Sequence, residues 1–176
     1  MPFLKKWFTW GVGISGWQIG REQTVFELKD SVKGLNTKFA GLICYESVFS
    51  EFVSEFVKKG AEYIIIVTND GWWGDNSGPE QHNQYAVLRA VENRKWIVRC
   101  AQTGVSCFID PLGNTYDKIP YWQTGVIDRN IISNNEITFY TANGDITGKA
   151  GVIVFIFSLL AVIINYVYKR KVKSSA

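Results

Sequence analysis

A run of uncharged residues near the C-terminus constrains this chain more than any other feature of its sequence. It reads AGVIVFIFSLLAVIINYVY over residues 150–168, and its clearly polar side chains are Ser158 and Asn165. At about 1.5 Å per residue, a helix of this length matches the hydrocarbon core of a bilayer. Core helices of soluble proteins are rarely apolar on every face. The run therefore predicts a transmembrane helix between residues 1–147 and a tail at residues 169–176.

The tail is basic and indicates an orientation. It reads KRKVKSSA, and positive charge beside a membrane helix is typical of the cytoplasmic side. We expect a cytoplasmic C-terminus, with residues 1–147 on the other side of the membrane. The net charge of +3 is small and much of it lies in this tail, so no nucleic-acid partner is predicted. The opening MPFLKKWFTWGVGISGW is a poor match for a signal peptide, because glycines interrupt its apolar stretch.

Composition favours a folded domain without a metal or cofactor. A chain of 176 residues that is 47% hydrophobic can bury one core. Cys44, Cys100 and Cys107 form no CxxC pair, and His82 is the single histidine of the chain, so no zinc-ligand spacing is present. Cys100 and Cys107 stand in apolar, strand-like surroundings, where plain buried thiols are the expected state.

Strand-like and helix-like patterns alternate along the chain. Apolar strand patterns cover residues 38–45, 61–68, 97–102 and 105–114, the last of them closed by a Pro-Leu-Gly-Asn turn, and helical patterns cover residues 47–60 and 79–96. In the first helical pattern one apolar stripe contains Val48, Phe49, Phe52, Val53, Phe56 and Val57. Apolar strands that alternate with helices indicate an α/β domain, with helices packed on the faces of a parallel sheet.

The same pattern brings candidate site residues together. Cys44 ends the first strand, and the polar loop NDGWWGD at residues 69–75 follows the second. Because neighbouring parallel strands end at one edge of a sheet, these residues should lie side by side. A helix that follows Cys44 would favour its thiolate, and the backbone N–H of Tyr45 could face a developing oxyanion. From the pattern alone, Cys44 is either a nucleophile or a buried thiol.

Other residues near Cys44 keep two interpretations each. His82 could be the base of a Cys/His pair, although a structural hydrogen bond is the favoured interpretation. Glu46 is either a supporting acid of the site or a helix-start carboxylate. Trp72 and Trp73 are either core anchors or aromatic residues that contact acyl chains or the membrane interface.

Four motifs together resemble a known family. They are GLICYE (41–46), VTNDGWWGDNSGPEQH (67–82), RAVENRKWIVRCAQTGVSCFIDPLG (89–113) and TFYTANGD (138–145), the last of which leads directly into the apolar run. In order and spacing they resemble the carbon-nitrogen hydrolase (nitrilase) domain of the apolipoprotein N-acyltransferase family. The resemblance covers residues 38–173.

This resemblance implies an α/β fold, as part of a nitrilase-like αββα sandwich followed by one C-terminal transmembrane helix. It places the globular part on the periplasmic side of the inner membrane. The family transfers an acyl chain from a glycerophospholipid, through a cysteine thioester, to the α-amine of the diacylglyceryl cysteine of an apolipoprotein. Cys44 matches the nucleophile, Glu46 a supporting acid, and Tyr45 the residue whose N–H holds the oxyanion. The residues expected beside the substrate lipid are Asn69, Asp70, Trp72, Trp73 and His82.

The chain departs from the family at its start. In the family a general-base glutamate and an oxyanion-holding lysine precede the cysteine, whereas this chain opens with MPFLKKWF. Lys5 and Lys6 fall after the lysine motif, so neither takes that role. The resemblance therefore implies the C-terminal part of a longer enzyme, from a truncated gene, a split gene or a partial sequence, with little activity alone. Two other functions stay open: a membrane-tethered amidase of the nitrilase type, and a non-catalytic single-pass binding module.

Overall fold

The computed structural model describes residues 22–32, 34–74 and 76–174. Lys5 and Lys6 lie outside these residues. In chain order the elements are β1 (Val25–Asp30), β2 (Leu35–Ile43), η1 (Cys44–Val48), α2 (Ser50–Lys58), β3 (Tyr63–Thr68), η2 (Gly71–Trp73), α3 (Gly78–Asn93), β4 (Trp96–Ala101), β5 (Ser106–Ile109), β6 (Thr115–Ile119), α4 (Phe139–Asn143) and α5 (Ile146–Ser174).

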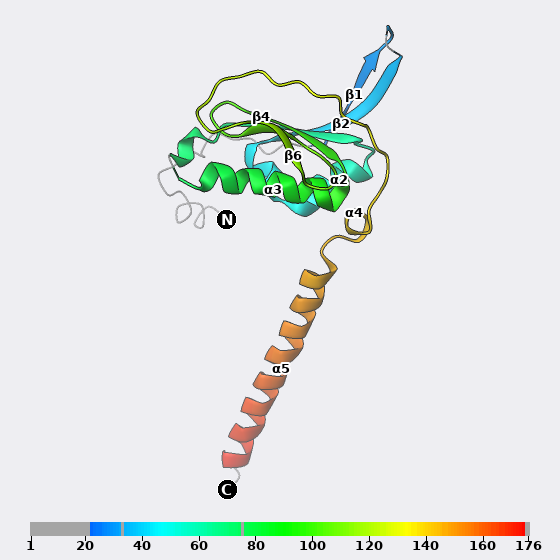
Figure 1. Ribbon diagram of the computed structural model, residues 1–176. Coiled ribbons are helices and arrows are strands. Elements are labelled where there is room, and N and C mark those ends of the chain that lie inside the picture. The colour runs from blue at the N-terminus through cyan, green and yellow to red at the C-terminus, as the bar shows by residue number, and fades with distance from the viewer. Residues whose placement is uncertain (1–21, 33, 75, 175–176) are drawn as a thin grey trace.

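The described strands form one mixed sheet in the order β1-β2-β3-β4-β5-β6. The central strands β2, β3 and β4 are parallel, because α2 and α3 carry the chain back between them. At the two edges, β1 is antiparallel to β2, and β5 is antiparallel to both β4 and β6. Both helices lie on the same side of the sheet (Figure 1). The predicted α/β layering is confirmed, with one helical layer on one face of one sheet.

The core lies between this sheet and the two helices. The buried apolar side chains are Ala40, Leu42, Val53, Phe56, Val57, Ala61, Ile64, Ile66, Ala86, Ala90, Ile97, Val105, Cys107 and Ile109. Alternate strand residues point to the helices, and each fully buried Leu or Ile stabilises the fold by roughly 1.5–3 kcal/mol.

The predicted helical stripe at residues 47–60 is partly wrong. Val53, Phe56 and Val57 are buried as expected, but the Phe49 side chain is 61% exposed. The reason is the backbone: residues 44–48 form a short 3-10 helix, and α2 begins only at Ser50. Phe49 has extended backbone angles between the two helices, which turns its side chain out of the stripe.

The two remaining cysteines lie on opposite faces of the sheet. Cys107 is fully buried among the core residues, and burial raises the pKa of its thiol to about 11. Cys100 is exposed, so the prediction of a buried thiol there is wrong. The reason is the alternation of strand side chains between the two faces of a sheet. The Arg99 side chain is buried on the helix side of β4, so the side chain of Cys100, the next residue, points to the other face.

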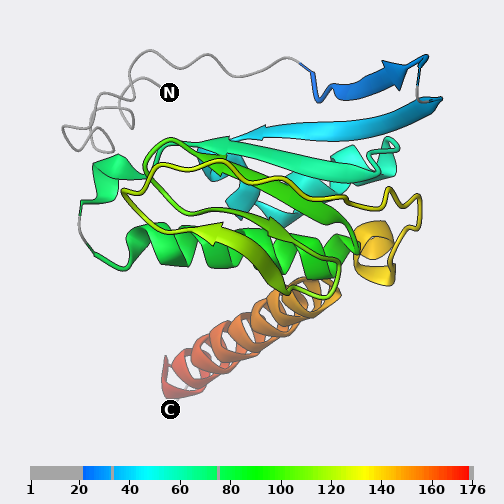
Figure 2. The ribbon, with the colours of Figure 1, turned by 45° about the horizontal axis from the view of Figure 1, so that its top comes forward.

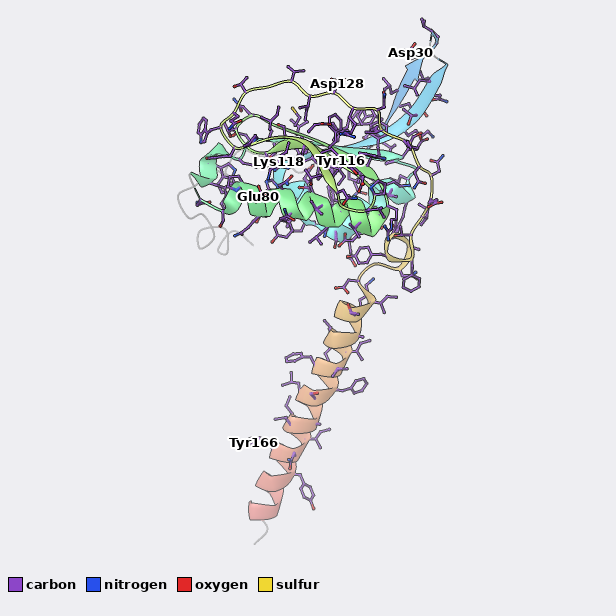
Figure 3. The ribbon with its side chains drawn as sticks, in the orientation of Figure 1. Asp30, Glu80, Tyr116, Lys118, Asp128 and Tyr166 are labelled. Atoms are coloured by element: carbon purple, nitrogen blue, oxygen red, sulfur yellow. The ribbon has the colours of Figure 1, made fainter. Side chains whose placement is uncertain are left out.

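The strand and the closing turn predicted over residues 105–114 are confirmed as β5 and the turn that follows it. In this turn the Asp110 carboxylate accepts the N–H groups of Leu112 and Asn114 at 2.8 and 2.9 Å. β6 then returns antiparallel to β5, and Lys118 on β6 pairs with Glu80 on α3 at 2.9 Å (Figure 3).

A long segment between β6 and α4 crosses the sheet face opposite the helices (Figures 1 and 2). At its start Trp122 N–H donates to the Thr103 carbonyl at 3.0 Å. At its end the buried Lys95 ammonium donates to the carbonyls of Asn134 and Glu136, the latter at 2.8 Å. These contacts fix the two ends of the segment to the loop after β4 and to the residue before β4.

The apolar run forms a helix that projects away from the sheet, with Tyr166 far from the globular part (Figure 3). Within the described residues one helix is long and apolar enough to cross a membrane, over Ile146–Tyr166, and none of its apolar window is buried. α5 begins before the predicted residue 150, because the Asp145 carboxylate caps it by accepting Gly148 N–H at 2.8 Å. The tail at residues 169–174 continues this helix.

Candidate active site

Cys44 lies at the turn from β2 into η1, in a backbone conformation that side chains rarely adopt. Its φ is +52°, whereas Ile43 before it is extended at φ −106°. A non-glycine residue in this region costs on the order of 1–3 kcal/mol, and such residues cluster at active sites. A strained strand-to-helix turn of this kind raises a nucleophile above the end of a sheet. We call residues 43–47 the elbow.

Two side chains hold the elbow from within. The Ser47 hydroxyl donates to the Cys44 carbonyl at 2.9 Å, and Ser47 is buried. The Glu46 carboxylate accepts Ile43 N–H at 2.7 Å. Both bonds span three residues and close the turn on the two sides of Cys44. In this geometry Glu46 acts on the backbone of the elbow.

A buried charged cluster lies beneath the elbow. The Asp70 carboxylate follows β3 and accepts from His82 Nδ1 and from Arg99 Nη2, each at 2.8 Å, and from the Thr68 hydroxyl at 3.0 Å. Burial opposes ionisation of Asp70. The hydrogen bonds from His82 and Arg99 outweigh burial and lower the pKa of Asp70 to about 2. Asp70 is therefore an acceptor only, so His82 Nδ1 carries a proton.

His82 joins this cluster to the elbow. Its Nε2 lies 3.4 Å from the Ser47 hydroxyl oxygen, the same hydroxyl that bonds the Cys44 carbonyl. A continuous chain of polar contacts thus runs from Arg99 on β4, through Asp70 and His82, to the backbone of Cys44. All of its side chains below the elbow are at most 2% exposed.

Gly104 leaves room for the charged cluster. A Cβ atom at this position would overlap the Asp70 carboxylate. The backbone between β4 and β5 therefore approaches Asp70 as closely as it does because residue 104 has no side chain.

Aromatic rings surround the elbow on its outer side. The Tyr45 ring centroid lies 5.5 Å from that of His82 and 6.4 Å from that of Trp73. Trp72 and Trp73 stack at 4.1 Å. Trp73 is half-buried and packs against Gly78 at the start of α3, whereas Trp72 is 58% exposed.

An open pocket of about 520 Å³ lies beside Cys44. Its lining residues are Ile43, Cys44, Val67, Thr68, Asn69, Trp72, Cys100 and Gln102. The Asn69 carboxamide oxygen accepts from the Thr103 hydroxyl at 2.7 Å and from Gly71 N–H at 3.0 Å. With its oxygen occupied, Asn69 presents its NH₂ group as the part that can bind a ligand.

The structure brings the predicted site residues to one end of the sheet, at two depths. Cys44, Asn69 and Trp72 line the pocket. The resemblance predicts Asp70 and His82 beside the lipid, but both are buried beneath the elbow. The polar contacts of His82 with Asp70 and Ser47 agree with the structural role that the sequence pattern favours. Tyr45 and Trp73 lie between these depths.

Sequence reasoning missed several residues of this region. They are Ser47, Arg99, Cys100, Gln102 and Gly104. The alternation of side chains along β4 predicts that Arg99 and Cys100 lie on opposite faces of the sheet. It does not predict which of the two faces the helices cover. Within the described residues, no three His, Cys, Asp or Glu side chains are arranged to hold a metal ion.

Comparison of the sequence with known proteins identifies relatives of this chain. The profile of the carbon-nitrogen hydrolase family matches residues 8–136. The chain is 42% identical over 160 residues to an apolipoprotein N-acyltransferase of Chlorobaculum tepidum. The aligned part covers 88% of this chain and 30% of the relative. The chain is 35% identical over 156 residues to apolipoprotein N-acyltransferase 1 of Treponema denticola, covering 88% and 28%.

A solved structure supports the fold. Nit3 of Saccharomyces cerevisiae, a member of the nitrilase superfamily, superposes with a TM-score of 0.50 at 24% identity, covering 61% of this chain and 40% of that protein. This likeness concerns the fold alone. The chain spans about 30% of the length of the acyltransferase relatives that it matches.

Proposed function

The chain belongs to the carbon-nitrogen hydrolase family, and on that premise we propose that it carries the nucleophile of an N-acyltransferase. Cys44 would accept the acyl group of a glycerophospholipid as a thioester and pass it to the amine of a diacylglyceryl-cysteine apolipoprotein. The observation that carries this proposal is the Cys44 elbow, where a cysteine with φ +52° borders an open pocket with apolar lining residues.

The first step of the proposed reaction is thiolate attack on an ester. The Cys44 sulfur bonds to the ester carbonyl carbon, the carbon–oxygen bond to glycerol breaks, and the leaving oxygen takes the proton that the Cys44 thiol gave up as lysophospholipid departs. Negative charge develops on the carbonyl oxygen. The backbone N–H of Tyr45, at the start of η1, would stabilise that charge, and the Asn69 NH₂ group at the pocket edge is a second candidate donor.

The second step returns Cys44 to its starting state. The acceptor amine attacks the thioester carbonyl, the carbon–sulfur bond breaks, and an amide forms as the proton that the amine loses passes to the departing Cys44 sulfur. This ping-pong sequence needs a proton acceptor. In the structure Glu46 has a different contact, since its carboxylate accepts Ile43 N–H at 2.7 Å, one residue before the nucleophile. We assign Glu46 to positioning the elbow.

The proposed partners are a phospholipid donor, an apolipoprotein acceptor and the membrane itself. An alkyl chain matches the apolar part of the pocket lining, and α5 supplies a helix that fits a bilayer. We propose that α5 crosses the inner membrane, with the sheet on the periplasmic side and the basic tail in the cytoplasm. The bilayer then supplies the lipid donor in the same compartment as Cys44.

Intact-mass spectrometry tests this proposal. The chain is reconstituted in vesicles whose phospholipid carries a labelled acyl chain, alone and with an N-terminal fragment of an acyltransferase relative. We expect a hydroxylamine-labile acyl adduct on Cys44 when the fragment is present. Adding a diacylglyceryl-cysteine peptide should then move the label to an amide, whereas release as free fatty acid would indicate hydrolysis.

Two cysteine variants make the assignment specific. Cys44→Ala should abolish the adduct, whereas Cys100→Ser, which removes the exposed thiol in the same pocket, should keep it. An adduct that survives in Cys44→Ala, or its absence from both preparations of the folded chain, would overturn the proposal.

A further inference from the structure

Arg89 on α3 is a buried cation that contacts the far end of the helix η1. It is 5% exposed. Its Nη1 donates to the Val48 carbonyl at 3.0 Å, and its Nη2 donates to the Glu92 carboxylate at 2.8 Å. Val48 is the last residue of η1, the helix that begins at Cys44. One guanidinium therefore joins α3 to the end of the helix that starts at the nucleophile.

The ion pair between Arg89 and Glu92 does not by itself account for this burial. Burial lowers the pKa of Arg89 and raises the pKa of Glu92, which means that it disfavours both charges. Desolvation of a buried pair offsets most of its attraction, so such a pair adds little net stability. Glu92 holds one arm of the planar guanidinium and thereby directs the other arm at the Val48 carbonyl. The effect of the pair is geometric.

Hydrogen bonds hold η1 at both of its ends. At its start the Ser47 hydroxyl donates to the Cys44 carbonyl at 2.9 Å, and at its end Arg89 donates to the Val48 carbonyl. The last carbonyls of a helix lack partners within the helix, so a side-chain donor fixes the position of this end. Between the two ends lies Tyr45, whose N–H is the proposed donor to the oxyanion. Loss of the far support would let η1 tilt and move that N–H.

The α3 end of this contact is itself fixed by α4, which packs beside α2 and α3 (Figure 1). The Thr138 hydroxyl donates to the Glu92 carbonyl at 2.6 Å. The fully buried Asn93 carboxamide oxygen accepts from the Thr141 and Ser54 hydroxyls at 2.9 and 3.1 Å. The last turn of α3 therefore holds a fixed position relative to α2.

We propose that Arg89 is a positioning residue, which fixes the end of η1 so that the Tyr45 N–H meets the oxyanion formed at Cys44. This inference rests on the proposed function for its reaction, and on the two hydrogen bonds of Arg89 for its geometry. It predicts an effect on acyl transfer to Cys44, in which an oxyanion develops. Alkylation of the same thiol develops no oxyanion and should change little, because the Ser47 bond to Cys44 remains.

Two reactions at Cys44 separate these effects. With p-nitrophenyl acetate, the sulfur bonds to the carbonyl carbon and p-nitrophenolate leaves with the electron pair. With iodoacetamide, the sulfur bonds to the methylene carbon and iodide leaves with the electron pair. Both reagents are activated, so both rates are measurable whether or not a phospholipid forms the thioester. The ratio of the acylation rate to the alkylation rate, followed by peptide mapping, reports stabilisation of the oxyanion.

The variants are built in the full chain on Cys100→Ser, which leaves Cys44 as the accessible thiol, since Cys107 is fully buried. The double substitution Arg89→Met with Glu92→Leu replaces the pair by apolar side chains of similar size and leaves no unpaired charge in the interior. We expect it to lower the ratio at least about threefold. Arg89→Lys keeps a cation that can donate to either acceptor without the planar fork, and should give an intermediate ratio.

Lys95→Met is the matched control. Lys95 is also a buried cation, and it donates to the Glu136 carbonyl at 2.8 Å. It precedes β4, whereas Cys44 follows β2, so the two residues lie at opposite ends of a parallel sheet. Its loss should destabilise the fold and leave the ratio unchanged.

Two outcomes would overturn this inference. One is a ratio in the double variant equal to that of the parent, and the other is an equal fall in Lys95→Met, which would mean a general loosening of the fold. Where the double variant does not fold, an unchanged ratio in Arg89→Lys overturns it instead. Failure of the phospholipid thioester assay with a retained Arg89 effect would remove the acyl-transfer proposal and leave Arg89 as the support of the Tyr45 N–H.

Discussion

Asp70 accepts a hydrogen bond from Arg99 Nη2 at 2.8 Å with both side chains withdrawn from water, Asp70 at 0% and Arg99 at 1% exposure. Buried charges of this kind are tolerated when each is paired. Here the pair joins the loop after β3 to the centre of β4. Through His82 it also reaches Ser47 and the Cys44 carbonyl. The stability of the sheet and the geometry of the elbow therefore depend on one cluster.

Asp70→Asn should destabilise the chain strongly. It leaves the Arg99 guanidinium buried without its counter-charge, which costs on the order of 3–5 kcal/mol. The free energy of unfolding is measured by urea titration in detergent. Asp128→Asn, at an exposed position (Figure 3), is the matched control and should change it by less than about 0.5 kcal/mol. Equal effects of the two substitutions would contradict a stabilising role for the cluster.

Asp70 also predicts how stability depends on pH. Its pKa of about 2 lies below its ordinary value of 3.8, so the folded state binds the proton less readily than the unfolded chain. This contribution to stability is complete above about pH 4 and is lost as the pH falls through about 2, with a total of about 2 kcal/mol. Denaturant titrations between pH 5 and pH 2 should show the decline, and Asp70→Asn should flatten it. A variant that keeps the full decline would assign it to other carboxylates.

Gly104→Ala tests the close approach of the Gly104 backbone to the Asp70 carboxylate. The added Cβ would overlap the Asp70 carboxylate, so the carboxylate must move away from Arg99 or the backbone must shift. We expect a loss of about 1–3 kcal/mol in unfolding free energy. Gly151→Ala on α5, where nothing lies within 4 Å, should be close to neutral. A neutral Gly104→Ala would mean that the loop between β4 and β5 adapts freely.

Ser47→Ala should change the elbow more than the fold. The substitution removes a hydrogen bond to the Cys44 carbonyl with a net value of about 1 kcal/mol. Without it, the polar link from His82 through Ser47 to the Cys44 carbonyl is lost, and the Cys44 thiol should lose its fixed orientation. We expect a severalfold change in the rate of Cys44 alkylation by iodoacetamide, with Ser50→Ala at the start of α2 as the control. An unchanged rate would show that the elbow holds its shape without Ser47.

The sequence allowed the layering and the location of the site to be predicted, because both depend on local patterns. Apolar strands that alternate with helices require parallel pairing, and parallel pairing brings Cys44 beside the loop after β3. The missed features depend on distant partners. Arg99 is a charged residue that is buried because Asp70, 29 positions earlier, accepts its hydrogen bond. Cys100 is an apolar residue that is exposed because the helices cover the opposite face of β4.

Glu46 is the residue on which the structure and the simplest chemical expectation give different predictions. Its carboxylate accepts Ile43 N–H at 2.7 Å, one residue before the nucleophile. If Glu46 acts only by holding the elbow, Glu46→Gln keeps an accepting oxygen and should retain most of the thioester formation at Cys44, whereas Glu46→Ala should lose it.

If the carboxylate instead transfers a proton, both substitutions should abolish thioester formation, because the amide of glutamine cannot act as an acid or base. The comparison is made by intact-mass spectrometry in the fragment-supplemented vesicles, with Cys44 alkylation as a second readout of elbow geometry. We expect Glu46→Gln to retain both readouts and Glu46→Ala to lose both. An inactive Glu46→Gln with normal alkylation would move Glu46 from positioning to proton transfer.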